Sequence, residues 1–379
     1  MGHFPEPARA RDVVWKQRLR QLARDFADVR RHIKRRLGLL APLRIAMYGG
    51  YGTPGEMRVL GRVLEEHERA EPRIEDGPFS NFKRSFRQLE SDEVANVELE
   101  LQVQSAPNPR DLERETARVV TDEDGYFVLR HRFASPATPG WLPLHARVTA
   151  APYPVSALPS AGCEVLIPSP RARFGVISDI DDTILQTYVR NRARMVYLTL
   201  VYNPLTRASF EGTAELYRGL RECGDGAPFF YVSKSMWNLF PLLQNFIANQ
   251  RLPRGPLLLR QVSLFSPRPS VPHKANAIAE LLATYPALPF ILIGDSGEQD
   301  LELYLDAAHA NPGRVPVILI RNVSPPAQHA ALEQRAQRSV PPGCRVLVFQ
   351  DTQRAIDLCA ELGFWRPAPP KTLPPPPGA

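Results

Sequence analysis

The sequence contains few cysteines and no long apolar run. Its 379 residues include 4 cysteines, and none of them forms a CxxC pair. Structural zinc sites and disulfide scaffolds need closely spaced cysteines, so the spacing excludes both classes. No stretch approaches the roughly 18 apolar residues of a membrane-spanning helix, and the amino terminus is charged rather than a secretion signal. We therefore expect a reduced, cytoplasmic protein.

Glycine is outnumbered by proline, with 23 glycines against 39 prolines. Proline breaks helices and central strands, so this content excludes an all-helical bundle and indicates many turns and stiff linkers. Residues 365–379 are mostly proline, and we expect them to form an extended, disordered tail. The length predicts two or three domains, because most domains contain about 100–200 residues.

The positive charge is concentrated at the amino terminus. The net charge is +7, and residues 1–40 hold 11 basic and 4 acidic side chains, which gives 11 − 4 = +7. Apolar residues recur there at spacings of three and four, from Trp15 to Ile33, which predicts a basic amphipathic helix. Such a helix could pack on the body of the protein or lie on an anionic membrane surface. Nucleic-acid binding is not expected, because no aromatic-rich strand or zinc motif accompanies the charge.

Residues 41–168 show the alternating pattern of half-buried strands. Val97–Gln104 alternates apolar and polar residues without a break, and turn sequences separate it from similar runs. The other predicted strands are Leu43–Tyr48, Met57–Leu64, Tyr126–Arg130, His145–Ala150 and Glu164–Ile167. Several short strands at this spacing predict an antiparallel β-sandwich.

From residue 169 to residue 364 the strands become continuously apolar and alternate with helical stretches. The predicted strands are Phe174–Ser178, Pro228–Val232, Pro256–Leu259, Pro289–Ile293, Val315–Ile320 and Arg345–Phe349. The helical patterns are Gly212–Arg221, Trp237–Gln250, Lys274–Ala283, Gln299–Ala308, Ala327–Gln337 and Thr352–Leu362. This alternation predicts an α/β domain with a doubly wound, mostly parallel sheet.

Acidic, hydroxyl and lysine side chains follow these strands where each strand ends. Asp179 and Asp181 follow the first strand, Ser233 follows the second, Lys274 opens a helix, and Asp295 follows the fourth. The carboxyl ends of parallel strands share one edge, so we expect these groups to meet there. Crowded carboxylates favour a hard divalent cation such as Mg²⁺, and a lysine and a hydroxyl suit phosphate. The pattern therefore predicts phosphoryl transfer.

The motifs also resemble a known family. Asp179-Ile180-Asp181-Asp182-Thr183, Ser233, Lys274 and Gly294-Asp295 through Asp300 are similar, in that order, to the four motifs of the haloacid dehalogenase superfamily of phosphatases. Within it, Tyr231-Val232-Ser233 and His273-Lys274 resemble the catalytic domain of the actin-patch phosphatidate phosphatases. The resemblance implies a haloacid dehalogenase-like fold and the hydrolysis of phosphatidate to diacylglycerol.

The resemblance also implies a role for each matched residue. Asp179 would be the nucleophile that forms an aspartyl-phosphate, and Asp181 the general acid and base. The implied Mg²⁺ site comprises Asp179, the main-chain oxygen of Asp181, Asp295 and Asp300. The implied phosphate-binding residues are Thr183, Ser233 and Lys274.

Three alternatives stay open. Residues 184–211 combine an apolar stretch with Arg190, Arg192, Arg194 and Arg207, and could dock an anionic lipid surface or pack on the core. The substrate could be a soluble phosphomonoester instead of phosphatidate. The chain could also be a catalytically silent scaffold that acts through its basic helix and proline-rich tail.

Overall fold

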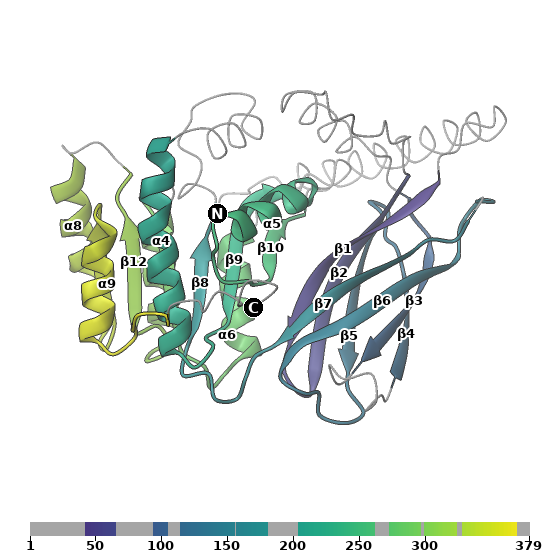
Figure 1. Cartoon of the computed structure of the whole chain (residues 1–379), viewed down its shortest axis with the longest axis horizontal. Coiled ribbons are helices and arrows are strands. Elements are labelled where there is room, and N and C mark those ends of the chain that lie inside the picture. Colours follow the sequence, from purple (N-terminus) through teal and green to yellow (C-terminus); the bar gives the residue numbers. More distant parts are fainter. Residues whose placement is uncertain are drawn as a thin grey trace, which may run out of the picture.

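A computed structural model describes residues 42–65, 94–104, 114–155, 157–180, 204–261, 273–296, 299–323 and 328–369. These residues form two sheets with helices around the second (Figure 1). The predicted amino-terminal helix, residues 184–203 and residues 370–379 lie outside the described residues. Within the described part of the chain, no helix combines the length and the apolar character needed to cross a bilayer.

The first sheet contains seven strands in the order β4-β3-β6-β7-β1-β2-β5. They are β1 (Leu43–Gly52), β2 (Glu56–Glu65), β3 (Glu98–Gln104), β4 (Arg114–Val120), β5 (Tyr126–Arg132), β6 (Gly140–Ala150) and β7 (Ser160–Ile167). All neighbouring strands are antiparallel except β1 and β7, which pair in parallel. The sheet is therefore mixed.

The first sheet curls until its two edge strands meet. Glu115 on β4 accepts one hydrogen bond from the Ala134 main-chain nitrogen at 3.0 Å and contacts His131 Nε2 on β5 at 2.6 Å. The apolar face of each strand points inward; Leu99 and Leu101, for example, are fully buried in this core. The result is nearly a barrel.

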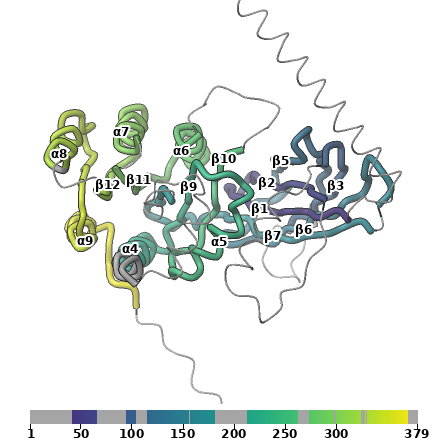
Figure 2. Tube along the Cα trace, turned by 90° about the horizontal axis from the view of Figure 1, so that it is seen from above, coloured from purple at the N-terminus to yellow at the C-terminus, as the bar shows by residue number. Residues whose placement is uncertain are grey.

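The second sheet contains six parallel strands in the order β10-β9-β8-β11-β12-β13. They are β8 (Gly175–Asp179), β9 (Phe229–Met236), β10 (Leu257–Arg260), β11 (Phe290–Asp295), β12 (Val317–Arg321) and β13 (Arg345–Phe349). The helices are α4 (Pro204–Cys223), η2 (Trp237–Leu239), α5 (Phe240–Asn249), α6 (His273–Thr284), α7 (Asp300–Ala310), α8 (His329–Arg338) and α9 (Thr352–Glu361). Figure 2 shows α6, α7 and α8 on one face of the sheet and α4, α5 and α9 on the other.

The predicted fold class, a mostly parallel haloacid dehalogenase-like sheet preceded by an antiparallel β-sandwich, is wrong. The structure is a mixed α/β fold in which an all-parallel sheet follows a mixed, nearly barrel-shaped one. The alternating pattern gives each strand one buried face, and that requirement is the same in a sandwich and in a barrel. It does not encode which strands pair. The domain boundaries at residues 40, 168 and 364 stay a prediction.

The order of the parallel strands places a topological switch point beside β8. The chain runs outward from β8 to β9 and β10, then returns to β11 on the other side of β8 and continues outward to β12 and β13. The connections that leave β8 and β11 therefore diverge. Ligands of open α/β sheets bind at such a point, beyond the carboxyl ends of the strands.

Candidate functional site

Two buried carboxylates lie at the carboxyl ends of adjacent strands. Asp179 is the last residue of β8 and Asp295 the last residue of β11, and these strands pair in parallel with Ser178 opposite Ile293. Both strands are buried along their whole length, because they run through the middle of the sheet. As whole residues, Asp179 and Asp295 are 2% and 0% exposed. The sheet thus directs both carboxylates to one edge.

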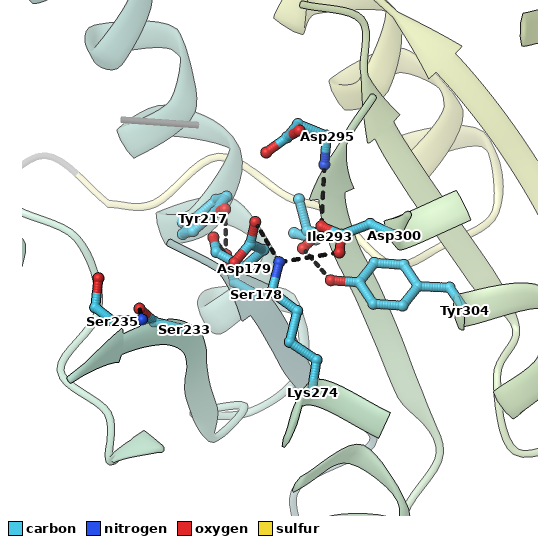
Figure 3. Close-up of polar contacts among 10 residues, drawn as sticks. All are labelled: Ser178, Asp179, Tyr217, Ser233, Ser235, Lys274, Ile293, Asp295, Asp300 and Tyr304. Atoms are coloured by element: carbon cyan, nitrogen blue, oxygen red, sulfur yellow. Dashed lines mark hydrogen bonds and ion pairs between the residues drawn. The ribbon is translucent and has the colours of Figure 1, made fainter. Parts of the chain in front are cut away.

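A third carboxylate returns to this edge at the start of α7. Asp300 Oδ2 accepts a hydrogen bond of 3.4 Å from the main-chain nitrogen of Asp295. A Cβ atom at Gly294 would lie 2.5 Å from Asp300 Oδ2, so this close approach requires glycine. Carboxylate oxygens of Asp179, Asp295 and Asp300 all lie within 4.8 Å of one another (Figure 3).

A buried lysine joins two of the three carboxylates. Lys274 Nζ lies 2.9 Å from Asp179 Oδ2 and 3.0 Å from Asp300 Oδ1, and its side chain is 3% exposed. Lys274 is the second residue of α6, and the preceding His273 contacts the Leu258 carbonyl oxygen through Nε2 at 3.0 Å. That contact ties the start of the helix to β10. The first turn of α6 thereby directs the ammonium group into the carboxylate cluster (Figure 3).

The acidic cluster has the composition of a site for a divalent cation. The three carboxylates outnumber the two basic groups beside them, the buried Lys274 and the part-buried Arg321, which interacts electrostatically with Asp295. An excess of negative charge in a buried space is costly unless a cation offsets it. All three carboxylates offer oxygen atoms, the ligands that Mg²⁺ prefers. Asp179, Asp295 and Asp300 are therefore the described residues that could hold a metal ion.

Two buried tyrosines support the main chain beneath the cluster. The Tyr217 hydroxyl lies 2.7 Å from Ser178 Oγ, which donates to the Asp179 carbonyl oxygen at 2.9 Å. The Tyr304 hydroxyl donates to the Ile293 carbonyl oxygen at 3.1 Å. Burial raises the pKa of Tyr217 to about 12, and burial followed by the nearby carboxylates raises the pKa of Tyr304. Both phenols therefore stay protonated at neutral pH and fix the ends of β8 and β11.

The raised pKa of Tyr217 predicts a loss of stability in alkali. An unfolded tyrosine ionises near pH 10, but Tyr217 in the native protein holds its proton up to a pKa of about 12. Its contribution is fully present below pH 10 and is lost as the pH rises through 12, by roughly 2–3 kcal/mol in all. Tyr217→Phe is expected to make the free energy of unfolding in urea less dependent on pH between 10 and 12. An unchanged slope would contradict this account.

Ser233 lies on the neighbouring strand, beside the cluster. It belongs to β9 and comes one residue after Val232, which pairs with Asp179. Its hydroxyl oxygen accepts a hydrogen bond of 2.9 Å from the main-chain nitrogen of Ser235, and Figure 3 shows it to the side of the acidic cluster. The structure thus brings Asp179, Asp295, Asp300 and Lys274 together with Ser233 next to them. The predicted residues Asp181 and Thr183 lie outside the described residues.

The supporting residues were not predicted from the sequence. Ser178, Tyr217 and Tyr304 hydrogen-bond across different elements, and no local pattern reports a partner so far away in the chain. Helical spacing marks Tyr217 and Tyr304 only as members of buried helix faces. The one available signal was Gly294, since a glycine directly before a strand-end aspartate indicates a close approach of another group.

Comparison with known proteins finds matches to the part of the chain that contains these site residues. Residues 174–322 match the family model "Phosphatidate phosphatase APP1, catalytic domain". The phosphatidate phosphatase APP1 of Saccharomyces cerevisiae is 38% identical over 152 residues, which cover 39% of this chain and 26% of that protein. An uncharacterized protein of Schizosaccharomyces pombe is 34% identical over 157 residues, which cover 40% of this chain and 26% of that protein. The predicted resemblance to this catalytic domain is confirmed.

The chain spans about a quarter of the length of the curated relatives it matches. Among solved structures, a mutant of the PilB minor pilin from Streptococcus sanguinis aligns with a TM-score of 0.27 and 8% identity, covering 70% of this chain and 88% of that chain.

Proposed function

We propose that this protein is a Mg²⁺-dependent phosphatidate phosphatase that releases diacylglycerol and phosphate through an aspartyl-phosphate. The observation that carries the proposal is the buried cluster of Asp179, Lys274, Asp300 and Asp295, which lies within the segment that resembles the phosphatidate phosphatase catalytic domain. A carboxylate nucleophile, an ammonium group and metal-binding oxygens together form a set suited to phosphomonoester hydrolysis.

In this proposal Asp179 and Asp295 are carboxylate ligands of Mg²⁺, and Asp300 supports the ion. The main-chain oxygen of Asp181 joins them by the resemblance described above. When bound, the ion neutralises the acidic cluster and the charge of the substrate phosphate. Lys274 contacts Asp179 and Asp300 simultaneously, so it orients the carboxylate that attacks and holds a positive charge where phosphate arrives.

The proposed reaction has two steps. An Asp179 oxygen forms a bond to phosphorus while the bond from phosphorus to the diacylglycerol oxygen breaks, and Asp181 gives that oxygen its proton. Asp181 next takes a proton from water as the water oxygen attacks phosphorus, which releases inorganic phosphate and restores the Asp179 carboxylate. Thr183, Ser233 and Lys274 bind the phosphate oxygens in both steps.

Phosphatidate resides in membranes, so the proposed substrate requires the protein to reach a lipid surface. We therefore propose a cytoplasmic protein with peripheral contact to anionic membranes. The excess positive charge of residues 1–40 supports this contact, because each basic group near an anionic surface adds about 1 kcal/mol of attraction.

The proposal predicts metal-dependent phosphate release with a preference for lipid. In mixed micelles containing phosphatidate, release is expected with Mg²⁺, to fall to the background rate with EDTA, and to recover with excess Mg²⁺. The rate on phosphatidate is expected to exceed that on glycerol phosphate or a nucleoside monophosphate at least about tenfold, since acyl chains add apolar binding energy.

Two outcomes would contradict the proposal. Faster release from the soluble esters would make the protein a phosphatase of soluble phosphomonoesters. No Mg²⁺-dependent release from any ester would leave it without catalytic activity.

A further inference from the structure

The first sheet packs against the turn that follows the predicted phosphate-binding strand. The Tyr48 ring on β1 stacks on Trp237, with ring centroids 4.6 Å apart and an interplanar angle of 29°. The Tyr48 ring also contacts Phe240 in a T-shaped arrangement, at 5.1 Å between centroids. Trp237 is 6% exposed and directly follows the last residue of β9, the strand that contains Ser233. Tyr48 therefore fixes the path that the chain takes as it leaves Ser233.

An arginine of the first sheet reaches the next residue of the same turn. Arg62 on β2 is 5% exposed, and its guanidinium lies 4.3 Å from the centroid of the Tyr126 ring. Arg62 Nε donates to the Asp124 carbonyl oxygen at 2.9 Å, and Nη1 donates to Asn238 Oδ1 at 3.3 Å. The first two contacts fix the guanidinium within the first sheet. Asn238 is thus anchored to a rigid group.

The same sheet also contacts α6, the helix that contains Lys274. Arg58 Nε on β2 lies 3.3 Å from Glu280 Oε1 in the middle of the helix. Tyr285, directly after the helix, donates from its hydroxyl to the Gly52 carbonyl oxygen at 3.1 Å. These two contacts connect the carboxyl-terminal half of α6 to β1 and β2. The hairpin of β1 and β2 is therefore attached to the two described elements that present predicted phosphate ligands, β9 with Ser233 and α6 with Lys274.

We infer that the β1–β2 hairpin of the first sheet is a positioning part of the phosphate site rather than a separate binding module. This inference rests on the proposed function. Tyr48 and Arg62 hold the turn after Ser233, and the contacts to α6 hold the helix of Lys274. Of the three proposed metal ligands, Asp179 is the last residue of β8, and Asp295 and Asp300 come from β11 and α7, on the other side of β8 from β9. Loosening the hairpin contacts should therefore weaken phosphate binding more than metal binding.

The test compares phosphate affinity with metal affinity in the full chain. For Tyr48→Leu and Asn238→Ala, the inhibition constant of inorganic phosphate is expected to rise about threefold to tenfold, the range of a lost aromatic or charged hydrogen-bond contact. The Mg²⁺ concentration for half-maximal activity is expected to stay within about twofold of the wild-type value. Tyr48→Phe keeps the stacked ring and is expected to restore phosphate affinity.

The matched control removes an aromatic contact elsewhere in the same sheet. Phe133 follows β5 and packs at a T-shaped angle on His131, with centroids 5.6 Å apart. Phe133→Leu is expected to lower the melting temperature. It is expected to leave the inhibition constant of phosphate and the Mg²⁺ concentration for half-maximal activity at their wild-type values. The control separates a general loss of stability from a specific loss of positioning.

Two results would overturn the inference. The first is an inhibition constant of inorganic phosphate that stays unchanged in Tyr48→Leu and Asn238→Ala but rises in Ser233→Ala. This result would leave the proposed function intact and remove the positioning role. The second is an equal increase, in these two hairpin-contact variants, of the inhibition constant of phosphate and of the Mg²⁺ concentration for half-maximal activity. This result would show general loosening of the site. If Ser233→Ala and Lys274→Met also leave phosphate release unchanged, the proposed function itself fails.

Discussion

Asp179→Asn is expected to lower kcat for phosphate release at least about a thousandfold, because an amide oxygen is a very poor nucleophile. The substitution preserves the size and shape of the side chain, so the buried end of β8 can keep its packing. It removes the negative charge that Lys274 Nζ contacts at 2.9 Å. The measurement is the initial rate on phosphatidate micelles at saturating Mg²⁺, with the melting temperature as a check on folding.

The control for this variant is the same substitution on an exposed aspartate. Asp306 lies on the solvent-facing side of α7, the helix that begins with Asp300. Asp306→Asn is expected to retain the wild-type rate. A rate for Asp179→Asn within about tenfold of the wild-type value would exclude Asp179 as the nucleophile.

Lys274→Met is expected to destabilise the protein by about 3–5 kcal/mol when EDTA is present, because it removes one partner of two buried ion pairs and leaves their carboxylates uncompensated. Saturating Mg²⁺ should restore part of this loss. A cation that binds only the native state at 100 times its dissociation constant adds about 2.7 kcal/mol of stability. The measurement is the free energy of unfolding in urea, with EDTA and with Mg²⁺.

An exposed lysine on β9 provides the control for Lys274→Met. Lys234 follows Ser233 on β9 and is exposed. Lys234→Met is expected to change the free energy of unfolding by less than about 1 kcal/mol, as surface charges do. An equally small change for Lys274→Met would mean that the buried cluster is not held together by its ammonium group.

The elements of the second sheet were largely predictable because each buried strand is an uninterrupted apolar run. Pro289–Ile293 was predicted and Phe290–Asp295 observed, so the sequence missed only the strand's polar end. β4 (Arg114–Val120) was missed, since it lies at the edge of the first sheet and its side chains are mostly polar or exposed. The parallel pairing of β1 with β7 joins segments more than a hundred residues apart, and no local pattern reports it.

The candidate site was predictable where one rule of topology was enough. Parallel strands end at a common edge, which brought Asp179 and Asp295 together from sequence alone. The proximity of Lys274 to Asp300 depends on the start of two helices and required the structure. The hydrogen bond between Tyr217 and Ser178 joins buried groups from α4 and β8, and neither residue type is distinctive of such a role.

The central claim is that Asp179 becomes covalently phosphorylated during turnover. The most direct measurement uses phosphatidate with a radiolabelled phosphate, an acid quench within the first turnover, and mapping of the label by peptide digestion. We predict label on the peptide that contains Asp179, more of it in Asp181→Asn because hydrolysis of the intermediate slows, and none in Asp179→Asn. Label on a different residue would contradict the account. So would product formed in the first turnover with no label on the wild-type protein or on Asp181→Asn.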